Sequence, residues 1–173
     1  MIVVYGGRRP SDAEGEFPPA SLPVIERRLD DMLTMLRPRL AIGSAAAGTD
    51  LLAASAALKA GAAVELLVTS DAEEFVAASI ADKGAEWTNR YRALAAAPLA
   101  EVIELPGVAS DDEGFSEVVH RILSRAEEAR HDGEGLTVVI VSAGRRPGTD
   151  HSEDMADAAF RRGHRVARVS PST

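Results

Sequence analysis

Short apolar runs alternate along the chain with stretches of helical spacing. The most apolar runs have the pattern of strands that are buried on both faces of a sheet. These runs cover residues 2–5, 40–42, 64–68 and 136–141. Weaker runs at 100–105 and 165–169 predict two further strands.

Between these runs, apolar residues recur every three or four positions, which is the spacing of one helix face. The predicted helices cover residues 22–36, 49–60, a short segment around Phe75, a segment through Trp87 and Leu94, residues 115–126 and residues 150–162. Strict alternation of strands and helices predicts an α/β fold. We expect a single Rossmann-like domain over residues 1–173, doubly wound around a mainly parallel sheet of about six strands with helices on both faces.

Loops at the carboxyl ends of the strands are where such sheets bind ligands. Three loops share this predicted position, at residues 6–10, 43–50 and 142–150. The first continues into a segment rich in Arg, Asp, Glu and Pro, so that residues 8–19 form a predicted long functional loop.

The second loop begins at Gly43 and Ser44 and reaches Gly48 through three alanines. Small residues let backbone N–H groups approach an anion at the start of the following helix. Thr49 and Asp50 stand where a triphosphate P-loop needs Lys and then Ser or Thr, which disfavours an ATPase or kinase. Two interpretations remain open for these two residues. They cap the helix, or they contact the ligand, with Asp50 on a ribose hydroxyl.

The tetrapeptide Gly-Arg-Arg-Pro occurs after the first strand and again after the strand at 136–141, and it supplies Arg8, Arg9, Arg145 and Arg146. Four arginines at the expected ligand edge of an acidic protein indicate a clamp for phosphate or carboxylate. The alternative is that they are solvated and pair with nearby acids. The triplet Gly-Thr-Asp also recurs, at Gly148, Thr149 and Asp150, which suggests one site built from two similar loops.

Composition narrows the classes of function. A formal net charge of -8 argues against a nucleic-acid polymer as partner, and the absence of Cys excludes thiolate chemistry. The four His residues are scattered over different predicted elements, so we expect no metal site, and no motif indicates a cofactor. Neither a signal peptide nor a membrane span is predicted, and we expect a soluble, cytoplasmic protein. The single Trp, Trp87, is expected in the core, with base stacking as the alternative.

The motifs VYGGRRP, AIGSAAAGTDLLAAS and VIVSAGRRPGTD, in this order, resemble the SLOG superfamily, a Rossmann-like group that includes the DprA proteins and the Lonely Guy phosphoribohydrolases. The resemblance implies binding of a nucleotide-derived small molecule, in some members with cleavage of an N-glycosidic bond. It places at the ligand Gly6, Gly7, Gly43, Ser44, Gly48, Thr49, Asp50, Gly148 and Thr149.

One departure from the Lonely Guy pattern concerns catalysis. Those enzymes carry two glycines before Gly-Thr and a catalytic Glu soon after, whereas this chain has Arg146 and Pro147 there and its next Glu is Glu153. Our leading hypothesis is therefore ligand binding or sensing. The alternatives are a phosphoribohydrolase that uses Glu153 or Asp154 as its catalytic carboxylate, and a protein-interaction module without a ligand. A homodimer or an effector-linked partner stays open.

Overall fold

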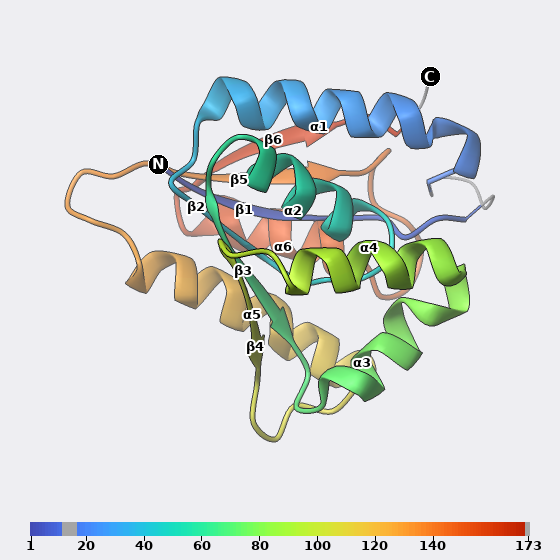
Figure 1. Cartoon of the computed structure of the whole chain (residues 1–173). Coiled ribbons are helices and arrows are strands. Elements are labelled where there is room, and N and C mark those ends of the chain that lie inside the picture. The colour runs from blue at the N-terminus through green and yellow to red at the C-terminus, as the bar shows by residue number, and fades with distance from the viewer. Residues whose placement is uncertain (12–16, 172–173) are drawn as a thin grey trace.

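The computed structural model describes residues 1–11 and 17–171. Within them, six strands form one parallel sheet in the order β4-β3-β2-β1-β5-β6 (Figure 1). The strands are β1 (Ile2–Gly7), β2 (Leu40–Gly43), β3 (Ala63–Val68), β4 (Ala100–Glu104), β5 (Leu136–Val141) and β6 (Arg165–Val169). The predicted α/β, Rossmann-like doubly wound fold is confirmed, and every pairing within this sheet is parallel.

The helices fall where the spacing of apolar residues predicts them. They are α1 (Leu22–Leu36), α2 (Thr49–Lys59), α3 (Ala72–Ser79), α4 (Ala85–Ala95), α5 (Asp112–Glu128) and α6 (His151–Arg161), with short 3-10 turns η1 (Pro19–Ser21) and η2 (Ala81–Lys83). None of the helices in the described ranges combines the length and apolar character that crossing a bilayer requires.

The sheet is covered on both faces, and alternate strand residues serve the two layers. Val3 and Tyr5 of β1 pack into a core with α1, α2 and α4, whereas Ile2 and Val4 pack into a second core with α5 and α6. Trp87 is 7% exposed and belongs to the first core, as expected. Figure 1 shows the two helical layers with the sheet between them.

The direction of the winding changes at β1, and this change positions the site. From β1 the chain adds β2, β3 and β4 on one side, and then crosses to place β5 and β6 on the other side. Consequently the loops that follow β1 and β5 diverge toward opposite faces, which opens a crevice at their carboxyl ends. Residues 12–16 of the predicted long loop that begins in this crevice lie outside the described residues.

Gly43 ends β2 against the ring of Tyr5, which is fully buried. A Cβ atom at this position would lie 2.2 Å from Cε2 of Tyr5. The close approach of strand to ring therefore requires glycine at the start of the Gly43–Asp50 loop.

We predict that Gly43→Ala lowers the free energy of unfolding by about 1–3 kcal/mol, because the added Cβ would overlap the buried ring of Tyr5 and force it to shift. Chemical denaturation measures this loss. Gly135→Ala is the matched control, since a Cβ there would meet its nearest neighbour at 3.8 Å. Equal stability of the Gly43 variant and the wild type would contradict the packing argument.

Candidate functional site

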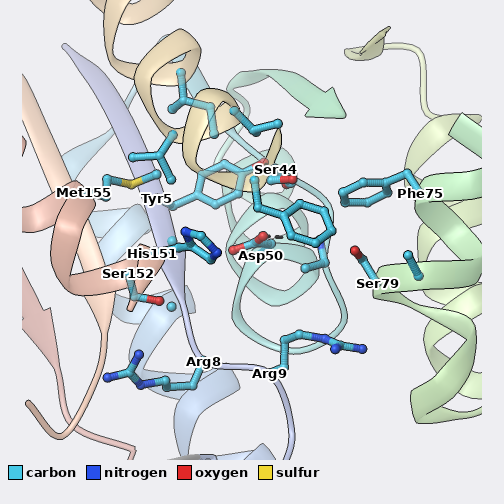
Figure 2. A pocket seen from close by; sticks show the side chains of 18 of the residues that line it. Tyr5, Arg8, Arg9, Ser44, Asp50, Phe75, Ser79, His151, Ser152 and Met155 are labelled. Atoms are coloured by element: carbon cyan, nitrogen blue, oxygen red, sulfur yellow. Dashed lines mark hydrogen bonds between the residues drawn. The ribbon is translucent and has the colours of Figure 1, made fainter. Parts of the chain in front are cut away.

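A cavity of about 400 Å³ occupies the crevice at the switch point of the sheet. Its walls come from the end of β1, the loop between β2 and α2, helix α3 with η2, and the first turns of α5 and α6 (Figure 2). The apolar part of its lining includes Phe75, Phe115, Val118, Ile122 and Met155. The polar part includes Arg8, Arg9, Ser44, Asp50, Lys83, Arg146 and His151.

Asp50 is a buried acid that lines the cavity. Its side chain is buried, and Oδ2 accepts a hydrogen bond of 3.2 Å from the N–H of Ala46. None of the described residues forms an ion pair with it. Burial raises the pKa of Asp50 to about 7, although the N–H of Ala46 and the charge of Arg9 oppose the rise. Figure 2 shows the carboxylate in the middle of the cavity.

The interpretation of Thr49 and Asp50 as helix caps is wrong. Helix α2 has Gly48 as its N-cap and receives no side-chain cap. Asp50 instead bonds backward to Ala46, and the hydroxyl of Thr49 donates to the carbonyl oxygen of Arg8 at 3.0 Å. Thr49 therefore ties α2 to the end of β1, while the carboxylate of Asp50 stays available to the cavity.

The guanidinium of Arg8 binds groups of the protein itself. Arg8 is 2% exposed and forms a two-point ion pair with Asp150, and its Nη2 also donates to the carbonyl oxygen of Gly144 at 2.8 Å. Asp150 in turn caps α6 by accepting from the N–H of Glu153 at 3.2 Å. This pair joins the loop after β1 to the start of α6, so the predicted ligand residues Arg8 and Asp150 bind each other.

The charge of Asp150 is held by this network. Burial alone would raise the pKa of Asp150, but hydrogen bonds from Arg8 and from the N–H groups of Arg146 and Glu153 lower it to about 2. Asp150 is therefore ionised at neutral pH and compensates the buried guanidinium of Arg8.

The other three arginines of the repeated tetrapeptide have different surroundings. Arg9 lines the cavity and forms an ion pair with Asp82 of η2. Arg146 also lines the cavity. Arg145 lies outside the cavity lining and pairs with Asp154 and Asp157 at 2.8 and 2.6 Å. The alternative that these arginines are solvated and pair with nearby acids therefore holds for Arg145. The four arginines do not form one clamp.

The predicted glycines divide in a similar way. Gly6 and Gly7 line the cavity, but Gly43, Gly48 and Gly148 do not. A Cβ atom at Gly7 would lie 2.6 Å from Oγ1 of Thr49, and one at Gly48, where φ is 99°, would lie 2.7 Å from the carbonyl oxygen of Arg8. Gly7 and Gly48 therefore allow β1 and α2 to meet closely.

Neither predicted catalytic carboxylate belongs to the cavity lining. Glu153 is 4% exposed, and its Oε1 accepts from Ser142 Oγ and from Arg168 Nη1, both at 2.6 Å. Asp154 is exposed and pairs with Arg145. In this structure Glu153 neutralises Arg168 and Asp154 lies on the surface, so the structure gives no support to a catalytic role for either carboxylate.

A polar cluster at the edge of the cavity joins the starts of α5 and α6. Asp112 accepts from Thr149 Oγ1 at 2.8 Å and lies 3.1 Å from His151 Nε2, and these bonds lower the pKa of Asp112. Asp112 and His151 line the cavity, whereas Thr149 does not. Among the residues described, no three His, Cys, Asp or Glu side chains gather as metal ligands would.

Several cavity residues were missed by sequence reasoning. Phe115, Val118 and Ile122 recur at helical spacing, and this pattern is the same whether a side chain packs in a core or lines a cavity. Lys83 and His151 belong to no motif, because only the fold brings them to this edge.

We predict that Arg8→Met lowers the free energy of unfolding by about 3–5 kcal/mol, because Asp150 would remain buried without its counter-charge. Arg145→Met, in the second copy of the tetrapeptide, should change stability little, since its side chain is 45% exposed. Urea denaturation of both variants measures the difference. Similar losses at both positions would refute the structural role of Arg8.

The pKa of Asp50 predicts a dependence of stability on pH. Between about pH 4 and pH 7 the folded protein keeps a proton on Asp50 that the unfolded chain releases, so this residue's contribution to stability falls as pH rises. Asp50→Asn removes this penalty. Relative to the wild type, the variant should gain about 2–3 kcal/mol between pH 5 and pH 8 in denaturation experiments. A difference that does not vary with pH would show that Asp50 ionises normally.

No protein-family model and no curated protein sequence matches the chain. A solved structure of DNA processing protein A (DprA) from Streptococcus pneumoniae is similar, with a TM-score of 0.46 and 14% sequence identity, over 95% of this chain and 57% of that chain. The chain thus spans little more than half of that structure, and the similarity concerns the fold alone.

Proposed function

We propose that the protein is a SLOG-like domain that binds a nucleotide-derived small molecule in the cavity at the carboxyl edge of the sheet. The observation that carries this proposal is the mixed lining of one cavity, which combines the apolar rings of Phe75 and Phe115, the carboxylate of Asp50, and the cations Arg9 and Lys83. A base, a sugar with hydroxyl groups and an anionic group present the same three chemistries in one molecule.

The base binds on the apolar side. The rings of Phe75 and Phe115 pack edge to face with centroids 6.4 Å apart, and Met155 and Ile122 extend the apolar surface. A flat heteroaromatic ring replaces water there and gains stacking or edge contacts with the two rings.

The sugar lies at Asp50. An ionised carboxylate accepts hydrogen bonds from two neighbouring hydroxyl groups, and such charge-assisted bonds are about twice as strong as neutral ones. Among the described residues, only the N–H of Ala46 donates a hydrogen bond to Asp50, so two ribose hydroxyls would supply donors that this carboxylate lacks.

Binding is favoured over the two alternatives. A hydrolase that acts through Glu153 or Asp154 lacks support, because neither side chain lines the cavity. An interaction module without a ligand would have a blocked or wholly apolar cleft here, whereas this cavity has about 400 Å³ of space and a mixed lining.

We expect at least one nucleoside or 5′-monophosphate in a panel of the four common bases to raise the melting temperature and to bind in calorimetry. Its 2′-deoxy form should bind about 10-fold more weakly, because one hydrogen bond to Asp50 is lost. Asp50→Asn should abolish this preference for ribose, and Asp154→Asn, outside the cavity, should retain it. Absence of binding by every compound to the folded protein would refute the proposal.

A further inference from the structure

The cations available to a ligand are fewer than the sequence suggests. Arg8 is buried against Asp150, and Arg145 pairs with two acids outside the cavity. Figure 2 shows the side chains of Arg8 and Arg9 extending to opposite sides of the strand end. Both Arg8 and Arg9 line the cavity, but Arg8 is held by its buried partner, so Arg9 is the more available arginine of the first tetrapeptide, and Lys83 of η2 lines the same cavity.

Arg9 already holds an anion of the protein itself. Its Nη2 forms an ion pair with Asp82, the residue before Lys83 in η2. Both side chains are partly exposed, at 36% for Arg9 and 45% for Asp82, so water and salt weaken their attraction. The Nε–H of Arg9 is buried and has no hydrogen-bond partner among the described residues. The guanidinium thus has unused donor capacity beside an exchangeable partner.

Lys83 supplies a second positive charge next to this pair. It is half-buried, it lines the cavity, and it forms no ion pair with a described residue. Arg9 comes from the loop after β1, and Lys83 comes from the turn after α3. Asp82, the ion-pair partner of Arg9, directly precedes Lys83 in that turn.

We propose that Arg9 and Lys83 form the anion subsite of the cavity and that Asp82 is an internal competitor which the ligand's phosphate displaces from Arg9. This inference rests on the proposed function and adds the residues that select the ligand by charge. A phosphate group carries up to two charges and three acceptor oxygens, so it can bond to Arg9 and Lys83 together, whereas the carboxylate of Asp82 pairs with Arg9 alone. A neutral nucleoside gains nothing from the exchange.

The effect of Asp82 on the affinity for charged and uncharged ligands can be measured. Because Asp82 must leave Arg9 before a phosphate binds there, the competitor lowers affinity for phosphorylated ligands and leaves affinity for uncharged ones unchanged. A nucleoside and its 5′-monophosphate share the same base and sugar. The ratio of their dissociation constants therefore measures what the phosphate gains at the subsite, independently of how well the base fits.

Asp82→Asn is the direct test, with calorimetry at low salt on the best-binding nucleoside, its 5′-monophosphate and inorganic pyrophosphate. The variant should bind the monophosphate and pyrophosphate about 3- to 10-fold more tightly and the nucleoside with unchanged affinity. Lys83→Gln should weaken both phosphorylated probes about 10-fold and spare the nucleoside. Asp154→Asn is the control, since it also removes a carboxylate from an exposed ion pair with an arginine, but outside the cavity.

The outcomes separate this inference from the proposed function. If the nucleoside binds and Asp82→Asn leaves both phosphorylated probes unchanged, or tightens them no more than Asp154→Asn does, the inference is wrong and the ligand site stands. If no nucleoside or nucleotide binds, the proposed function fails. In that case the binding of pyrophosphate tests the anion subsite by itself. An unchanged affinity for pyrophosphate in Asp82→Asn would overturn the inference.

Discussion

The buried ion pair between Arg8 and Asp150 holds together the part of the fold where ligands would bind. It links the end of β1 to the N-cap of α6 across the point where the winding of the sheet changes direction. Both charges of this pair are removed from water, and each compensates the other. Arg8 also donates to the carbonyl oxygen of Gly144, and Asp150 also accepts hydrogen bonds from backbone N–H groups. The pair keeps the walls of the crevice at a fixed separation.

That constraint explains the unusual state of Asp50. With Arg8 committed to Asp150, Asp50 has no ion-pair partner among the described residues, and burial raises its pKa to about 7 although the charge of Arg9 opposes the rise. Glycine at positions 7 and 48 brings β1 and α2 close enough to enclose it. The same packing that stabilises the crevice thus buries one acid without a direct ion pair, and such an acid is stabilised by a ligand that donates hydrogen bonds.

Sequence reasoning reached the fold because its signals are local. Apolar runs and helical spacing predict each strand and helix, and alternation of the two predicts a parallel sheet and its ligand edge. The site depends on contacts that local patterns do not encode. Arg8 and Arg145 occupy the same position in identical tetrapeptides, yet only Arg8 meets a buried acid, 142 residues away. Lys83 reaches the cavity, and Asp82 reaches Arg9, through η2, a short turn that no periodicity predicts.

An NMR titration of backbone amides with a 5′-mononucleotide tests most directly whether this cavity binds a nucleotide-derived ligand. We expect saturable shifts at Gly7, Ala46 and His151, which line the cavity, and none at Gly61 and Gly133, which precede β3 and β5 at the opposite edge of the sheet. Saturable shifts confined to the opposite edge, or no shifts at any concentration, would contradict binding at this cavity.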